Sequence, residues 1–445
     1  MIRRKDFEIV LSRWKVESLP EAKEREIKLP LNTQKIVSII GPRRAGKTYL
    51  MYLTIKELIK NIKKDNILFI DFEHERLRNL DANNLEEMLQ TFYELFKPNK
   101  NKPIYLFLDE IQNVKDWYKW IRGIHNLGKF RIYVSGSSSK LLSKEIATQL
   151  RGRSIDYLIL PLSFREFLNM KGYEQKNLEI LSHLEERGEI IGFLKEYLEF
   201  GGYPEVVLED SFDMKLKILQ SYYNAIFYKD IVERFNIRNI SLLDTFIKYH
   251  ISNISKYSSI SKVYNYLKGL GYKCGKNILL NFLKFVQDVF FIFTCEIFSF
   301  SIKNRMQYPK KVYLVDNGIA KAYGKEGIDW RMENNVFIEL FRRSDAFNNF
   351  QVFYWKEYGK RNGEEVDFVI TKGLEIKELI QVTYANSIDE INKREFKGLL
   401  KASKELKCNN LSIITWDFED KIKVENKIIK CIPLWKWNCQ NIFLP

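Results

Sequence analysis

Four apolar runs in the first third of the chain each end in small or polar residues. They cover residues 35–40, 66–72, 103–110 and 130–137 and are rich in Ile, Leu, Val and Phe. Continuous apolar runs of this length are typical of strands that a parallel sheet buries on both faces. Amphipathic stretches separate them, with apolar positions three to four residues apart. The alternation predicts an α/β domain with helices on both faces of a parallel sheet.

The pattern changes in the middle of the chain. Residues 197–235 have aromatic side chains at helical spacing, which we assign to a helical core. Three amphipathic stretches follow between residues 242 and 288, and then two β-rich runs at 290–303 and 311–315. This order predicts a winged helix-turn-helix, with residues 275–285 as the recognition helix and the two β-rich runs as the wing.

The net charge of the chain is +15, from 72 Lys and Arg against 57 Asp and Glu. The total is ambiguous, because lysines on solvated helices can keep a protein soluble without binding anything. Residues 251–311, however, contain ten cations and two acids, a net +8. This concentration favours nucleic acid as the partner, bound largely through its phosphates. Docking of a protein partner is the alternative use of such a helical module.

Membrane and disulfide signals are weak in this sequence. The longest central apolar run, residues 288–302, is broken by Glu296 and is too short to span a bilayer. The N-terminus has basic residues but lacks the apolar stretch of a secretory signal. The five cysteines form no CxxC pair. We therefore expect a cytoplasmic protein without membrane contact or a structural zinc site.

A phosphate-binding loop follows the first apolar run. The segment GPRRAGKT at residues 41–48 fits the pattern GxxxxGK[ST], with a predicted strand before it and a helical pattern after it. Backbone N–H groups of such a loop surround phosphates, Lys47 reaches the β and γ phosphates, and the Thr48 hydroxyl ligates Mg²⁺. The pattern predicts ATP and Mg²⁺ as cofactors, with the nucleotide bound by Gly41, Pro42, Arg43, Arg44, Ala45, Gly46, Lys47 and Thr48.

Two further apolar runs supply candidate catalytic residues. The third run ends in Asp109 and Glu110, and the fourth ends in Ser137. Parallel sheets bind ligands at the carboxyl ends of their strands, where an acidic pair has a use. We expect Asp109 to hold Mg²⁺ through water, Glu110 to act as the base for the attacking water, and Ser137 to sense the γ-phosphate. The alternative is that these strands simply end in polar residues.

The ordered motifs resemble a known family. GPRRAGKT, LFLDEIQ, YVSGSSSKLL, LRGRSIDYLILPLSFREFL and YLEFGGYPEVV are similar to motifs of archaeal and bacterial AAA-type ATPases that carry a C-terminal nuclease-like domain of unknown function. The resemblance covers most of the chain. It implies that Arg153, or less favourably Arg151, acts on the γ-phosphate in cis or from a neighbouring subunit of a homo-oligomer. A surface salt bridge is the alternative for Arg153.

The resemblance also implies a restriction-endonuclease-like α/β domain at the C-terminal end. In that fold a helical Glu, a strand Asp and a strand (D/E/Q)xK hold Mg²⁺ and orient water. Thr383 stands where the Lys belongs, and Lys372 and Lys377 are the lysines that could replace it. Because Thr supplies no cation, we predict weak or absent cleavage. The metal ligands of this vestigial site would be Glu339, Asp367 and Gln381, with Glu365 beside them.

These patterns predict four segments. They are an AAA-type P-loop ATPase core at 1–170, a helical lid or linker at 171–240, a winged helix-turn-helix at 241–325 and a degenerate, nuclease-like domain at 326–445. The function that fits them best is ATP hydrolysis on or with nucleic acid. A slow ATP-dependent switch that docks a protein is the alternative, and an ATP-dependent nuclease is a third hypothesis.

Overall fold

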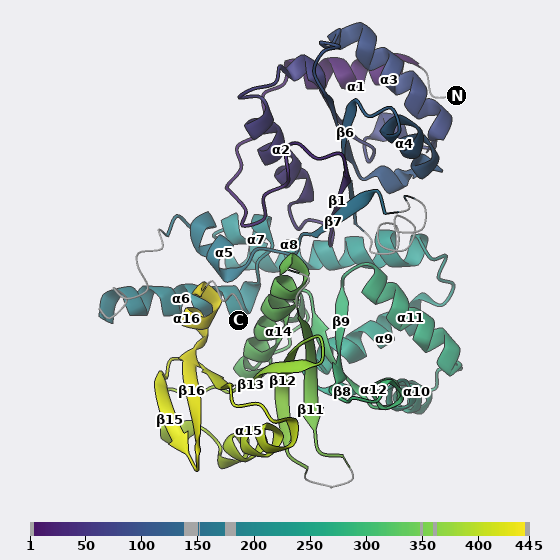
Figure 1. Cartoon of the computed structure of the whole chain (residues 1–445). Helices are drawn as coiled ribbons and strands as arrows, with labels where there is room; N and C mark the ends of the chain where they lie inside the picture. Colours follow the sequence, from purple (N-terminus) through teal and green to yellow (C-terminus); the bar gives the residue numbers. More distant parts are fainter. Residues whose placement is uncertain are drawn as a thin grey trace. The chain divides into compact units, whose positions relative to one another are not determined.

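The computed structural model describes residues 4–137, 150, 152–173, 184–347, 350–358 and 363–440. The chain divides into two compact units, Met1–Ile159 and Leu160–Pro445. Both units are drawn in Figure 1.

The first unit is built on a five-stranded parallel sheet, as predicted. Its order is β2-β4-β6-β1-β7. Every residue of β1 and β4 is buried, which explains their uninterrupted apolar sequences. The strands are β1 (Ile36–Ile40), β2 (Ile67–Asp71), β4 (Ile104–Asp109), β6 (Phe130–Gly136) and β7 (Ser154–Leu158).

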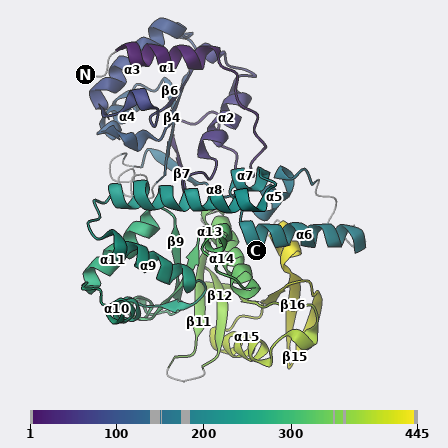
Figure 2. The same cartoon turned by 180° about the vertical axis from the view of Figure 1, so that it is seen from behind.

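Helices cover both faces of this sheet. Figures 1 and 2 show α2 (Lys47–Leu58) on one face and α3 (Ala82–Phe96) and α4 (Trp117–His125) on the other. Helix α1 (Arg4–Val16) packs at the edge of the sheet, against β2 and α3. Helix α1 buries Phe7, Leu11 and Trp14, which share one helical face. The Trp14 indole Nε1 donates a hydrogen bond to the Ile67 carbonyl oxygen (3.0 Å), which fixes α1 against the edge strand β2. A short parallel pair, β3 (Leu80–Asp81) and β5 (Val114–Lys115), completes the unit.

The second unit begins with helices. They are α5 (Phe164–Met170), α6 (Leu184–Phe200), α7 (Pro204–Leu208) and α8 (Phe212–Ala225), which continues as π-helix over Ile226–Glu233. A glycine turn separates α6 from α7. Gly201 has φ 78°, and an added Cβ would lie 1.7 Å from the Asp316 carboxylate. Asp316 accepts a hydrogen bond from the Gly202 N–H at 2.7 Å, so this turn requires glycine for close approach.

Next come four helices and three strands. Val263, Leu279, Phe282 and Val286 are buried, so the apolar stripes of α10 and α11 face inward as the sequence predicts. Strand β10 pairs antiparallel with both β8 and β9. The elements are α9 (Ile240–Ser252), β8 (Tyr257–Ser258), α10 (Ile260–Gly269), α11 (Lys276–Asp288), β9 (Ile292–Ile297), α12 (Ile302–Gln307) and β10 (Lys310–Leu314).

The remaining strands join those three in one nine-stranded mixed sheet. Its order is β15-β16-β14-β13-β12-β11-β9-β10-β8, and β9 meets β11 through a short parallel pair at residues 296–297 and 353–354. Strands expected in two separate domains therefore share a sheet. The elements are α13 (Asn317–Ala322), α14 (Ile328–Phe347), β11 (Gln351–Lys356), β12 (Glu365–Lys372), β13 (Glu375–Val382), α15 (Lys393–Leu406), β14 (Leu411–Thr415), β15 (Asp420–Val424), β16 (Lys427–Pro433) and α16 (Leu434–Cys439).

Two helices pack against this sheet. Helix α15 buries Leu399 and Ala402 in a cluster with Val366 and Leu379 of the strands. Helix α14 packs against β10, β11 and β13, and its Phe337 ring stacks on Tyr313 with centroids 4.0 Å apart. Within the described ranges, no helix is both long and apolar enough to span a membrane.

Candidate functional site

The loop between β1 and α2 has the backbone that phosphate binding requires. Gly41 has φ 148°, and a Cβ added there would lie 2.0 Å from the Ile159 carbonyl oxygen. The Ile159 N–H donates to the Ile40 carbonyl oxygen at 2.7 Å, so the chain after β7 runs directly beside the loop. Gly46 has φ 95° immediately before α2 begins. Both glycines of the motif are thus required by conformation or by close approach.

Lys47 closes this loop. Its side chain is 4% exposed and its Nζ donates to the carbonyl oxygens of Gly41 (3.2 Å) and Pro42 (3.0 Å). The same Nζ lies 3.5 Å from the Glu110 carboxylate. The ammonium therefore sits at the mouth of the loop, where it would meet a phosphate.

The predicted magnesium ligands come together at the end of β4. The Thr48 hydroxyl donates to Asp109 Oδ2 at 2.6 Å, and the Ser135 hydroxyl donates to Asp109 Oδ1. Burial raises the pKa of Asp109 to about 7, and the nearby Glu110 carboxylate adds to the rise. A divalent cation would offset this cost, because it favours the ionised carboxylate. Thr48 and Asp109 therefore fit Mg²⁺.

Glu110 is held beside this pair. It adopts the left-handed conformation (φ 49°), which is uncommon for a side chain other than Gly or Asn, and its N–H donates to the Ser135 hydroxyl at 3.0 Å. The Gln112 amide donates to the Glu110 carboxylate and lies 3.5 Å from the Ser137 hydroxyl. Gln112 thus links the expected base to the expected γ-phosphate sensor. Sequence reasoning missed Gln112 and Ser135, although each lies two residues from a predicted site residue.

The arginines are placed differently from the core residues. Arg43 pairs with Glu73 at 2.7 Å, and Arg25 donates to the Ala45 carbonyl oxygen at 2.8 Å, which braces the loop. Arg153 lies just before β7, where its carbonyl oxygen accepts from the Ile36 N–H at 2.8 Å. Ile36 is at the opposite end of β1 from the loop, so Arg153 is not brought to the phosphates of its own chain. Arg151 lies outside the described residues.

A second site was expected around Glu339, and there the expectation is wrong. Glu339 is buried among arginines: Arg342 Nε is 3.1 Å away, Arg343 Nε is 2.8 Å away and Arg165 is 3.9 Å away. The structure brings Glu333 toward Asp367 instead. The two glutamates are six residues apart, which places them on different sides of α14.

The residues that do converge form the Lys311 cluster, made of Lys311, Glu333, Asp367 and Gln381. Lys311 Nζ lies 2.7 Å from Asp367 Oδ1 and 3.0 Å from Glu333 Oε1. The Asp367 N–H donates to Gln381 Oε1 at 3.2 Å. Asp367 and Gln381 were predicted to be neighbours, whereas Lys311 and Glu333 were not placed here from sequence. The expected substitute Lys377 pairs with Glu375.

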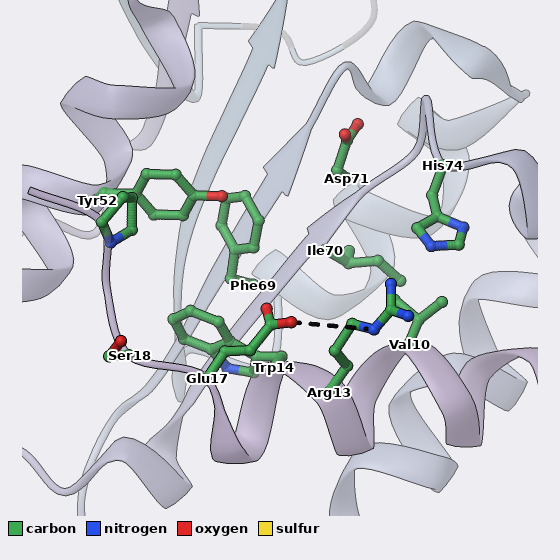
Figure 3. A pocket seen from close by; sticks show the side chains of 11 residues that line it. Val10, Arg13, Trp14, Glu17, Ser18, Tyr52, Phe69, Ile70, Asp71 and His74 are labelled. Atoms are coloured by element: carbon green, nitrogen blue, oxygen red, sulfur yellow. Dashed lines mark ion pairs between the residues drawn. The ribbon is translucent and has the colours of Figure 1, made fainter.

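A hollow of about 230 Å³ lies between α1, α2 and the end of β2. Figure 3 shows the side chains that line it. Its aromatic lining consists of Trp14, Tyr52 and Phe69, with centroid separations of 5.4 Å (Trp14 to Phe69) and 4.9 Å (Tyr52 to Phe69). Asp71 lines the same hollow and pairs with Asp109 in the sheet register. Burial, together with Asp109 and Asp71, raises the pKa of Tyr52 well above its ordinary value, so its hydroxyl stays protonated.

Comparison with known proteins gives two family matches. Residues 33–168 match a family model described as an AAA domain. Residues 192–329 match a model described as a domain of unknown function. The first match spans the phosphate-binding loop and all five strands of the parallel sheet.

Two solved structures align with much of this chain, but at low TM-scores. The Aeropyrum pernix Orc1 protein, solved in complex with DNA, is 11% identical and aligns over 76% of this chain and 93% of its own, with a TM-score of 0.29. AMPPCP-bound DnaA from Aquifex aeolicus is 13% identical over 63% and 86% of the two chains, with a TM-score of 0.21. At these TM-scores, nothing specific to either protein is transferred to this chain.

Two relatives match along most of their length. An uncharacterized protein of Methanocaldococcus jannaschii is 39% identical over 442 residues, which cover 97% of this chain and 94% of the relative. An uncharacterized protein of Haemophilus influenzae is 30% identical over 375 residues, covering 83% and 86% of the two chains. Together with the AAA-domain match, these relatives show that the chain belongs to a family of AAA-type ATPases with archaeal and bacterial members and a C-terminal region of unknown function.

Proposed function

We propose that the protein binds ATP with Mg²⁺, hydrolyses it, and does so on or with nucleic acid. The observation that carries the first part is the contact network of Lys47, Thr48, Asp109 and Glu110 at one edge of the parallel sheet. Lys47 would bind the β and γ phosphates, while Thr48 and Asp109 hold Mg²⁺ directly and through water. Glu110, positioned by Gln112, would orient the attacking water, and Ser137 would contact the γ-phosphate.

Removal of the Lys47 ammonium tests the nucleotide site. Lys47→Ala should lose ATP turnover, because the variant lacks the ammonium that would bind the phosphates. It should still fold, although loss of the ion pair with Glu110 lowers its stability. ATP hydrolysis and far-UV circular dichroism of the variant would be compared with those of the wild type and of Lys60→Ala, which changes an exposed lysine of the same unit. Wild-type turnover in Lys47→Ala would remove the site assignment.

The nucleic-acid part rests on the lysine segment, residues 245–287. It contains seven lysines and no Asp or Glu. Six of these lysines are exposed and have no ion-pair partner among the described residues, whereas Lys248 pairs with Asp244 at 2.7 Å. Uncompensated exposed cations on one segment attract a polyanion and release its counterions. The six are Lys256, Lys262, Lys268, Lys273, Lys276 and Lys284.

The elements around these lysines support a winged helix-turn-helix. Helix α9, strand β8, helices α10 and α11, and the antiparallel pair β9–β10 follow in the order that this module requires. The exposed side of α11 carries Lys276, Asn277, Asn281 and Lys284. Lys contacts phosphates and Asn can bond to an adenine edge, so α11 is the proposed recognition helix.

Stimulation of ATP hydrolysis distinguishes this function from a switch that docks a protein. Turnover would be measured with duplex DNA, branched DNA, single-stranded DNA and RNA at several salt concentrations. A nucleic-acid-dependent ATPase should be accelerated by at least one of them, less so as salt increases. Equal turnover with and without every nucleic acid would instead favour the protein-docking switch.

A further inference from the structure

The Lys311 cluster occupies the place where the resemblance implies a nuclease-like metal site. Such a site needs carboxylate oxygens that are free to ligate a divalent cation. Over the residues that the structure describes, no group of three or more His, Cys, Asp or Glu side chains is suited to hold a metal. The predicted third carboxylate, Glu339, is bound to arginines instead. The metal that the resemblance implies therefore does not fit the residues present.

Hydrogen-bond donors already occupy both carboxylate oxygens of Asp367 and one side-chain oxygen each of Glu333 and Gln381. Asp367 Oδ1 accepts from Lys311 and Asp367 Oδ2 accepts from the Val382 N–H at 3.0 Å. Glu333 Oε1 accepts from Lys311 and from the Tyr313 hydroxyl at 2.8 Å. Gln381 Oε1 accepts from the Asp367 N–H. One ammonium thus takes the central position between two carboxylates.

Burial makes this cation necessary. The Lys311 side chain is 3% exposed, that of Asp367 is 7% exposed and that of Glu333 is 16% exposed. The Lys311 ammonium contacts both carboxylates, and without it these two groups would repel each other in a buried site.

We propose that the Lys311 ammonium takes the place of a divalent cation in this cluster. The wild-type cluster then binds neither Mg²⁺ nor Mn²⁺ and supports no metal-dependent cleavage. Removal of the ammonium should leave Glu333, Asp367 and Gln381 arranged around a space that a divalent cation can enter. The inference rests on the contacts of the cluster and is independent of the function proposed for the nucleotide site.

Mn²⁺ binding to the full-length protein tests this inference. The parent for the experiment carries Thr48→Ala and Asp109→Asn, which silence the ATPase metal site. Electron paramagnetic resonance titration should detect no Mn²⁺ binding in the parent that depends on Asp367. Adding Lys311→Met should create one Mn²⁺ site per chain with at least tenfold higher affinity than any parent binding. Adding Asp367→Asn to that variant should remove the site.

A matched control is Lys310→Met. Lys310 lies next to Lys311 on β10, but it is 35% exposed and pairs with Glu296 at 2.7 Å. Its removal should create no Mn²⁺ site in the cluster, and a site that appears there would overturn the inference.

Two results would contradict the proposal directly. One is Mn²⁺ binding in the parent that Asp367→Asn abolishes, and the other is a folded Lys311→Met variant that binds no Mn²⁺. The first measurement needs no Lys311 variant, so the proposal stays testable even when Lys311→Met fails to fold. In that case Lys311→Met combined with Glu333→Gln, which removes the repulsion, should restore folding. If neither of these Lys311 variants folds and the parent shows Mn²⁺ binding that Asp367→Asn abolishes, the proposal is rejected.

Discussion

Lys47 and Glu110 neutralise each other across 3.5 Å in the nucleotide site. Both side chains are nearly buried, so each would be costly without the other. In the proposed mechanism, a bound γ-phosphate would offer Lys47 a stronger partner, and Glu110 would then be available to the attacking water. The ion pair between them is thus suited to hold the base in place until ATP is bound.

Replacement of Glu110 isolates its role as the base. Glu110→Gln keeps the shape of the side chain and an oxygen that can accept from Gln112, but it cannot take a proton. We expect ATP turnover to fall by roughly 10² to 10⁴-fold while ATP still binds. Single-turnover hydrolysis and nucleotide binding would be measured on the same protein. A wild-type hydrolysis rate would remove Glu110 from the role of base.

The raised pKa of Asp109 predicts a pH dependence for the metal. Burial and then Glu110 raise this pKa to about 7, so the carboxyl is mostly protonated at pH 6 and mostly ionised at pH 8. Mg²⁺ requires the ionised form, and its apparent affinity in the presence of ATP should fall about tenfold from pH 8 to pH 6. Magnesium titrations of ATP binding at both pH values would measure this change.

Asp71 provides the control for this titration. Its negative charge contributes to the raised pKa of Asp109, so Asp71→Asn should move the midpoint of the magnesium pH dependence to lower pH.

The raised pKa of Asp109 also changes how the free energy of unfolding depends on pH, with the opposite sign to that of a salt-bridged carboxylate. Without metal, ionised Asp109 is unfavourable in the fold, so stability from this group is lost as the pH rises from about 4 to about 7. A magnesium affinity that is equal at pH 6 and pH 8 would contradict the assignment.

At the scale of elements, the parallel strands were predictable because burial on both faces forces an apolar run. Residues 35–40 and 103–110 coincide closely with β1 and β4. Asp109 ends β4, and the loop after β1 leads to Thr48 at the start of α2. These two residues therefore meet at one edge of the sheet. Local sequence suffices where one element and its end define the site.

The Lys311 cluster was not predictable in the same way. Its lysine comes from β10, and its glutamate comes from α14, far from Asp367 in sequence. The family pattern instead places the lysine at position 383, two residues after Gln381. Only the continuous sheet that joins β10 to β12 through β9 and β11 brings them together.

The contact between the phosphate-binding loop and the segment after β7 makes Gly41 irreplaceable. Gly41→Ala would place Cβ 2.0 Å from the Ile159 carbonyl oxygen and strain a φ of 148°. We expect a loss of about 2 to 3 kcal/mol in the free energy of unfolding and loss of nucleotide binding. Chemical denaturation and ATP titration would measure both.

Gly123 offers a matched glycine in helix α4. A Cβ added there meets nothing within 4 Å, so Gly123→Ala should increase stability by about 0.5 to 1 kcal/mol. Equal stability changes in the two variants would contradict the close approach at Gly41.

At the scale of the whole molecule, the net charge of +15 is distributed unevenly. The lysine segment carries seven cations without an acid, whereas some exposed lysines elsewhere have a carboxylate partner, such as Lys60 with Glu57 and Lys119 with Asp116. The segment belongs to the same compact unit as the nine-stranded sheet. Any nucleic acid held by its lysines is therefore anchored to that unit.

The salt dependence of binding measures how many of these lysines act. Each phosphate contact changes the slope of log K against log salt by about 0.9 on duplex DNA. Replacing the six unpaired lysines with Gln should flatten the slope by up to about 5 and weaken binding for every sequence to a similar degree. Fluorescence anisotropy with a labelled duplex, measured at salt concentrations between about 50 and 200 mM, gives the slope.

The control is a variant with Lys60→Gln and Lys119→Gln, two lysines that already have ion-pair partners. These substitutions should leave the slope unchanged. A slope that these paired lysines flatten equally would mean that total charge, rather than the lysine segment, attracts the nucleic acid.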